Sequence, residues 1–130
     1  MRLLIFILGF IFITTGLKAQ DSLRGPHDGI VKEAGAYKIE LVECNDYFEV
    51  FIYTEHMDII HNYGNEGDIK YFYIDGTYKS FPLKYYGNDG FAAKVADGKF
   101  AYCRVTIEVL GTLVSLKFEN QFASLGGQDK

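Results

Sequence analysis

The segment Tyr37-Lys38-Ile39-Glu40-Leu41 decides the fold class, because apolar and charged residues alternate along its whole length. The same alternation recurs in residues 105–109 and 114–118, and in residues 48–52 Phe48, Val50 and Ile52 share one face while Glu49 lies on the other. A period of two is typical of antiparallel strands that bury one face and expose the other. We therefore predict an all-β chain. The apolar residues of these four segments form its expected core: Ile39, Leu41, Phe48, Val50, Ile52, Val105, Ile107, Val109, Val114, Leu116 and Phe118.

Turn-forming residues separate the alternating segments. Asp75-Gly76 lies between residues 69–74 and 77–83, and such a dipeptide is the strongest short-range signal for a β-hairpin. Short strands with a turn about every 8–12 residues are typical of a β-sandwich or a barrel. We predict an antiparallel β-sandwich, immunoglobulin-like or similar, of about seven or eight strands. Further turn signals are Asn45-Asp46, Asp97-Gly98 and Gly111.

The N-terminal segment has the pattern of a secretory signal peptide. Arg2 provides a positive charge, residues 3–13 are apolar apart from Gly9, and Ala19 is the expected cleavage position, with a cut after Gly16 as the alternative. The apolar run is far shorter than the ~20 residues of a membrane-spanning helix. We therefore expect a periplasmic or secreted protein with no membrane anchor after cleavage.

The expected organisation is a signal peptide over residues 1–19, a flexible lead over 20–27, one β-sandwich domain over 28–120 and a loose tail over 121–130. The 130 residues include 13 basic and 17 acidic side chains, for a formal net charge of −4. Phosphate contacts require clustered Lys and Arg, and none stands out, so we expect no nucleic-acid partner. Motifs such as Gly-x-Ser-x-Gly and His-Glu-x-x-His do not occur in the sequence, and we expect no catalytic residues and no enzymatic activity.

Residues 26–42 contain a two-part motif, Pro26-His27-Asp28-Gly29 and then Ala34-Gly35-Ala36-Tyr37-Lys38-Ile39-Glu40-Leu41-Val42. It resembles Pro-His-Gly-Gly followed by Ala-Gly-x-Tyr-His-Ile-Glu-Leu/Met-Val, the opening of a family of small exported bacterial β-sandwich domains. The similarity continues more weakly to about residue 120. It implies a periplasmic domain associated with heavy-metal resistance, with a metal ion or an efflux-system component as its partner. Asp28 and Lys38 depart from the family pattern, which has Gly and His there.

The three histidines of the expected mature chain are candidate metal ligands. The resemblance implies His27, whereas His56, Met57 and His61 follow from chemistry alone, since imidazole and thioether groups bind Cu or Zn. Their spacing matches no zinc motif, so scattered surface residues are the alternative. Lys38 stands where the family has a second His, and its ammonium group has no lone pair for a metal. We expect Lys38 to weaken metal binding at His27.

Cys44 and Cys103 are the candidates for one disulfide, which export would permit. Strand parity opposes the bridge, because Cys103 shares a face with inward Val105 whereas Cys44 lies on the face of Lys38 and Glu40. Both cysteines lie near strand ends, where a bulge can change parity. The bridged and the free forms therefore both stay open.

Tyrosines offer a second kind of binding site. Tyr71 and Tyr73 share one face of an expected strand, and Tyr85 and Tyr86 follow in a later connection. Exposed tyrosines can stack on a sugar or dock a protein, because each ring combines apolar area with a hydroxyl group. The alternative is that they are half-buried strand residues.

A weak internal repeat links two turns. Gly64-Asn65-Glu66-Gly67 is echoed by Gly87-Asn88-Asp89-Gly90. Both segments lack the alternating oxygen ligands of a calcium loop. They predict two turns with positive φ, which glycine adopts readily.

Two functional hypotheses follow. The first is a periplasmic metal-associated binding protein that acts as an accessory to a heavy-metal efflux system. The second is a non-catalytic module for protein or carbohydrate binding that has lost its metal site, as Lys38 suggests.

Overall fold

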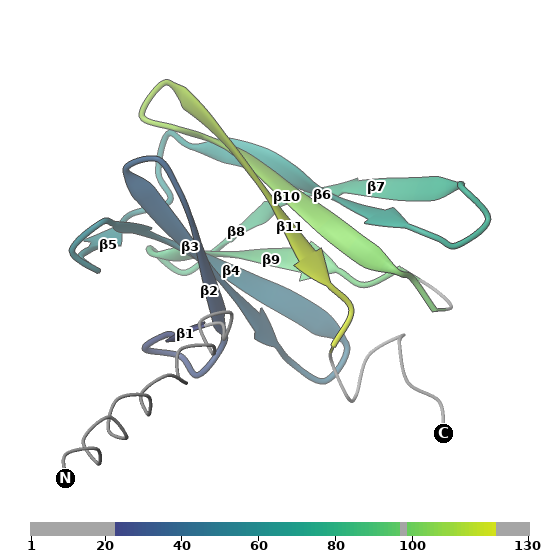
Figure 1. Cartoon of the computed structure of the whole chain (residues 1–130). Helices are drawn as coiled ribbons and strands as arrows, with labels where there is room; N and C mark the ends of the chain where they lie inside the picture. The colour runs from purple at the N-terminus through teal and green to yellow at the C-terminus, as the bar shows by residue number, and fades with distance from the viewer. Residues whose placement is uncertain (1–22, 97–98, 122–130) are drawn as a thin grey trace, which may run out of the picture.

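The alternating segments form strands of two antiparallel sheets that pack face to face (Figure 1). The computed structural model describes residues 23–96 and 99–121. One sheet has seven strands in the order β1-β2-β3-β4-β9-β8, with β5 paired to β4, and the other has four in the order β11-β10-β6-β7. The fold is a β-sandwich, as the alternation predicts. The strands are β1 (Leu23–Arg24), β2 (Ile30–Ala34), β3 (Tyr37–Glu43), β4 (Tyr47–Thr54), β5 (Ile59–Ile60), β6 (Glu66–Phe72), β7 (Tyr78–Pro82), β8 (Lys84–Tyr86), β9 (Gly90–Lys94), β10 (Tyr102–Val109) and β11 (Thr112–Glu119).

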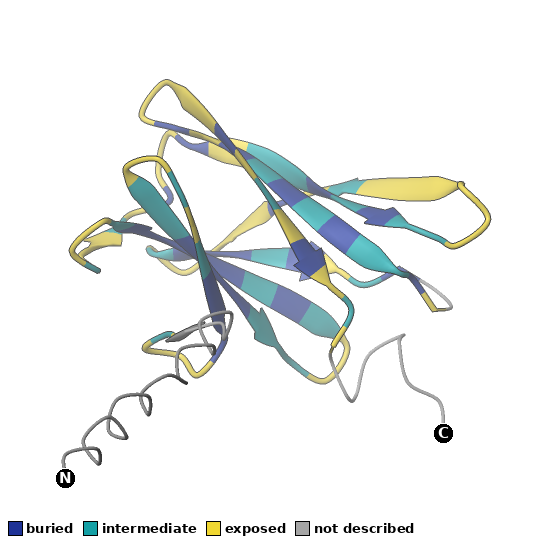
Figure 2. Ribbon diagram, viewed as in Figure 1, coloured by how far each residue is buried: buried dark blue, intermediate teal, exposed yellow. Residues whose placement is uncertain are grey.

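The strand register turns the apolar residues of both sheets toward the space between them. In the β3–β4 pair, Ile39 lies opposite Ile52 and Leu41 lies opposite Val50, and all four are fully buried. Buried and more exposed residues alternate along β10 as well (Figure 2). Of the eleven expected core residues ten are buried, and Leu116 packs against them while partly exposed.

Local turn chemistry closes two hairpins where the sequence predicts them. Across Asp75-Gly76, the backbone N–H of Tyr73 donates to the oxygen of Thr77 at 2.9 Å. In the β10–β11 turn, Leu110 and Gly111 have positive φ angles of 50° and 87°. Two successive positive φ angles define the type I′ turn, whose twist matches that of the flanking strands.

The organisation differs from the prediction at two points. Eleven strands, not seven or eight, occur in the described residues, because strands as short as β1, β5 and β8 leave no periodic pattern. The sheet also begins before residue 28, since Leu23 and Arg24 pair with β2, so residues 23–27 are not a flexible lead. The predicted signal peptide, the Asp97-Gly98 turn and residues 122–130 lie outside the described residues.

Both cysteines are free thiols. Cys103 is fully buried and faces the core from β10, as strand parity predicts. Cys44 directly follows β3 in the other sheet and is partly exposed. The structure therefore agrees with the unbridged alternative. Burial raises the pKa of the Cys103 thiol to about 12, which keeps the thiol protonated and unreactive.

Candidate functional site

A buried carboxylate lies on the outer face of the seven-stranded sheet. Glu40 points away from the core, on the face opposite to Ile39 and Leu41, yet its side chain is fully buried. The connection between β1 and β2, residues 25–29, folds over it. A carboxylate removed from water is stable only if its oxygens accept hydrogen bonds, so the donors around Glu40 determine whether this arrangement holds.

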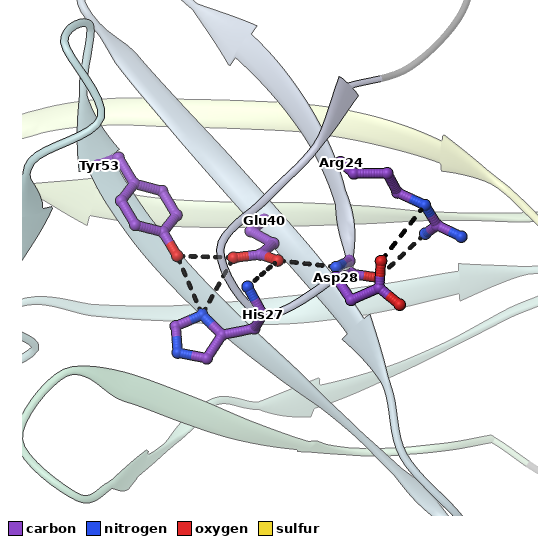
Figure 3. A network of polar contacts seen from close by, with 6 residues as sticks. Arg24, His27, Asp28, Glu40 and Tyr53 are labelled. Carbon is purple, nitrogen blue, oxygen red and sulfur yellow. Dashed lines mark hydrogen bonds and ion pairs between the residues drawn. The ribbon is translucent and has the colours of Figure 1, made fainter.

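Four donor groups surround the Glu40 carboxylate (Figure 3). The backbone N–H groups of His27 and Gly29 donate to Oε2 at 2.9 and 2.7 Å, and the Tyr53 hydroxyl donates to Oε1 at 2.6 Å. The Nδ1 atom of His27 lies 3.2 Å from Oε1 and 3.1 Å from the Tyr53 oxygen. Burial and the hydrogen bond to Glu40 raise the pKa of Tyr53 well above its usual value. The Tyr53 hydroxyl therefore keeps its proton and stays a donor.

Glycines allow residues 25–29 to approach the carboxylate. A Cβ atom on Gly25 would overlap the Glu40 carboxyl group, and one on Gly29 would lie 2.5 Å from the backbone oxygen of Leu41. Asp28 has a positive φ of 66°, and its backbone oxygen accepts a bond from Arg24 Nη1 at 3.0 Å (Figure 3). One carboxylate thus joins the two halves of the sequence motif, Pro-His-x-Gly and Tyr-x-Ile-Glu.

His27 is fixed on one side and open on the other. Its ring stacks on Phe51, with the centroids 3.8 Å apart and the planes at 5°, while its side chain stays 43% exposed. Nδ1 faces Glu40 and Tyr53, and Nε2 points away from these contacts (Figure 3). A proton on Nδ1, toward the carboxylate, leaves the lone pair on Nε2. The arrangement presents an oriented imidazole nitrogen to solvent.

His61 is oriented by a carboxylate in the same way. Its Nδ1 atom lies 2.6 Å from Oδ1 of Asp89, and its side chain is 71% exposed. The two residues follow β5 and precede β9, and both of these strands pair with β4. Because β5 and β9 pair with successive parts of β4, His61 and Asp89 come together although they are distant in sequence.

An open cleft of about 780 Å³ lies beside His61. Small-molecule sites are typically clefts of about 300–1,000 Å³, so this one can take such a ligand. Both sheets contribute to it, because Leu110 belongs to the β10–β11 turn, and the other residues belong to β5, β8 and the connections that follow these two strands. The lining consists of residues 59–63, Asn65, Tyr85, Gly87, Asn88 and Leu110.

The two turns of the internal repeat meet at this cleft. Gly64 and Gly87 have φ angles of 82° and 67°, which confirms the predicted turns with positive φ. The side-chain amide of Asn62, which lies just before the first turn, donates to the backbone oxygens of Gly87 and Gly90 in the second at 3.0 and 2.6 Å. Asn62 is only 3% exposed, so this connection is shielded from water.

A second buried amide ties the cleft to the other sheet. Asn65 accepts a bond from the backbone N–H of Leu110 at 3.0 Å and donates to the backbone oxygen of His61 at 3.0 Å. The hydroxyl of Tyr85 accepts a bond from the backbone N–H of Gly64 at 3.1 Å. These contacts fix the walls of the cleft.

The candidate metal ligands do not converge on one site. His27, His56 and His61 contact three different carboxylates, those of Glu40, Glu55 and Asp89. Met57 lies in the turn after β4 and has a positive φ of 68°. In the part of the chain that the structure describes, no group of three or more His, Cys, Asp or Glu side chains could hold a metal ion. A site that combines His56 and His61 with a neighbouring carboxylate is therefore not formed.

The remaining candidate residues lie elsewhere. Tyr71 is fully buried and its hydroxyl donates to the backbone oxygen of Lys94 at 2.6 Å, and Tyr73 packs against the core while partly exposed. The prediction that these two tyrosines form an exposed surface is therefore wrong, because they share a face with buried Ile69. Lys38 lies on the outer face of β3, opposite Tyr53, but the side chain of β3 that contacts His27 is that of Glu40.

Sequence reasoning missed the residues that organise the contacts around His27 and the walls of the cleft. Alternation assigns Glu40 to the exposed face, and its presence in the same motif as His27 is the one signal that could have linked the two residues. The buried amides of Asn62 and Asn65 lie in an irregular segment with no periodic pattern. Gly87, Gly90 and Leu110, to which these amides bond across the cleft, are far away in the sequence, so no local signal identifies the contacts.

Comparison with protein-family models, with curated proteins and with solved structures finds no match to this chain. The family resemblance of residues 26–42 therefore stays an expectation from the sequence. Among the described residues, no helix is long and apolar enough to cross a membrane.

Proposed function

We propose that this protein is an exported, non-catalytic binding module whose ligand occupies the cleft between residues 59–65, residues 85–90 and Leu110. Export is the expectation from residues 1–19. The cleft, rather than the histidines, is the feature that best supports a function, because it combines volume, fixed walls and exposed side chains with both apolar and polar character.

The observation that carries the proposal is the contrast between the walls and the lining of the cleft. The walls are fixed by buried Asn62 and Asn65. Large side chains nonetheless remain exposed in the lining, with Tyr63 at 87%, Tyr85 at 55% and Leu110 at 69%. Exposed apolar side chains that gather at a preformed cleft are typical of a binding site.

The test is a ligand screen followed by the amide chemical shifts of the isotope-labelled protein. The screen contains neutral disaccharides, short peptides and small amphiphiles. We expect at least one class to give saturable shift changes confined to the cleft segments, and we expect Tyr63→Ala to reduce them. A screen in which no class shifts these residues, or in which the shifts lie elsewhere, contradicts the proposal.

A metal-associated role is the second candidate, and one observation favours it. His27 and His61 each direct Nδ1 at a carboxylate, which is how proteins commonly orient an imidazole that binds a metal through its other nitrogen. Each would supply a single protein nitrogen to Cu or Zn, so we propose weak binding, with an efflux-system component as the partner that completes the site.

Calorimetric titration with Cu(II) and Zn(II) tests the metal-associated role. Lys38 lies opposite Tyr53, whose hydroxyl contacts His27, so a histidine at this position adds a second nitrogen nearby. We expect His27→Ala to abolish binding at His27, leaving that at His61, and Lys38→His to strengthen binding at His27. Unchanged affinity in both variants contradicts a metal site at His27.

A further inference from the structure

We propose that the ligand of the cleft is a neutral carbohydrate, with the apolar face of a sugar ring on Tyr63 or Tyr85 and its hydroxyl groups on His61 and Asn88. This inference rests on the proposed function and names the ligand class for the same site. Three properties of the lining support it: exposed rings, uncharged polar groups that both donate and accept, and a lack of cationic side chains.

The exposed rings provide the apolar contact. Tyr63 is 87% exposed, so nearly all of its ring is available, and Tyr85 is 55% exposed although its hydroxyl is fixed by Gly64. The C–H groups on one face of a pyranose ring pack on the negative face of an aromatic ring. Tyrosine suits this contact, because its hydroxyl keeps one end of the ring hydrated while the remainder is covered.

The polar groups of the lining match hydroxyl groups. With Nδ1 directed at Asp89, the Nε2 atom of His61 can accept a bond from a hydroxyl group. Asn88 is exposed, and its side-chain amide both donates and accepts. A sugar hydroxyl also donates and accepts, so it can satisfy either residue. An alkyl chain in the same place would cover these polar groups without giving them a partner, which carries a free-energy cost.

The charge of the lining excludes anionic ligands. None of the ten residues that line the cleft is Lys or Arg, and phosphate or carboxylate recognition relies on such side chains. The carboxylate of Asp89 lies beside the cleft, in contact with His61. A phosphorylated or acidic sugar would therefore meet a negative neighbour and no cation, whereas a neutral sugar meets neither penalty.

The experiment is a titration of the labelled protein with maltose, cellobiose and chitobiose, monitored by amide chemical shifts, with glucuronic acid as the charged comparison. We expect saturable shifts in residues 59–65 and 85–90 for at least one neutral disaccharide, and none for glucuronic acid. Tyr85→Ala should weaken the affinity about tenfold, which corresponds to about 1.4 kcal/mol.

Tyr86→Ala is the matched control. Tyr86 is on the same strand, is exposed to a similar degree (48%) and contacts Tyr47 instead of the cleft. We therefore expect the disaccharide affinity of this variant to stay within about twofold of that of the wild type. Equal loss in both variants, absence of binding by every neutral disaccharide, or binding of glucuronic acid as tight as that of the disaccharides overturns the carbohydrate assignment. If peptides or amphiphiles then shift the cleft residues, the ligand class alone is wrong and the binding module stands; if nothing does, both fail.

Discussion

Replacement of Glu40 by alanine tests the central structural claim about the outer face of the seven-stranded sheet. The carboxylate accepts bonds from two backbone N–H groups and from the Tyr53 hydroxyl, and it contacts Nδ1 of the His27 ring. Alanine removes both acceptor oxygens and leaves these donors without partners in a place that is closed to water. The free energy of unfolding should therefore fall by more than a typical surface substitution would cause.

The magnitude follows from the number and kind of these bonds. Each hydrogen bond to a charged group contributes about 1.5–3 kcal/mol, but the sum overstates the loss, because residues 25–29 can detach and hydrate their N–H groups. We expect Glu40→Ala to cost about 3–5 kcal/mol, the usual cost of breaking a buried charged contact. Glu40→Gln keeps one oxygen for the two N–H groups, and its amide can donate to Tyr53 and His27, so it should cost about 1–2 kcal/mol.

The assay is urea denaturation of the three proteins, followed by circular dichroism. Glu49→Ala is the matched control, since Glu49 lies on the same face of the adjacent strand and accepts one long bond from Tyr47 at 3.3 Å. It should change the free energy of unfolding by less than about 0.5 kcal/mol. If Glu40→Ala does not fold, the Gln variant and faster amide exchange at Gly29 still test the reasoning. Equal effects of Glu40→Gln and Glu49→Ala, with unchanged exchange at Gly29, would refute it.

Three further predictions concern thiol chemistry and backbone strain. Burial raises the pKa of Cys103 to about 12. In the native protein, iodoacetamide at about pH 8 should therefore modify Cys44 alone, which is partly exposed, whereas both thiols should react after unfolding. Detection of a native Cys103 adduct by mass spectrometry would contradict this. Leu110→Asn should raise the midpoint of urea unfolding, by about 1 kcal/mol in stability, since Leu110 has a φ of 50° that asparagine tolerates better. Gly67→Ala should cost about 3 kcal/mol in the same assay, because the added Cβ would overlap the backbone oxygen of Thr106 and lie 2.8 Å from the Cα of Ile107; a loss below about 1 kcal/mol would mean that the two strands can separate without cost.

The sequence by itself determined the β-sandwich and most of its core. Alternation in segments such as residues 37–41 and 105–109 is a local property, and it places the same residues on the buried face in the prediction and in the structure. The hairpins at Asp75-Gly76 and Gly111 were predictable for the same reason, since a turn depends on the conformations allowed to two adjacent residues. Tyr71 could also have been assigned to the core, because it shares its strand face with Ile69.

Tertiary structure alone decided the polar contacts and the cleft. Glu40 lies at a position that alternation marks as exposed, and it is buried only because residues 25–29 fold back over the sheet. The cleft exists because Asn62 binds Gly87 and Gly90, and because Asn65 binds Leu110. Hydrogen bonds between such distant residues depend on how the sheets and their connections meet in space. No periodicity within a single strand contains that information.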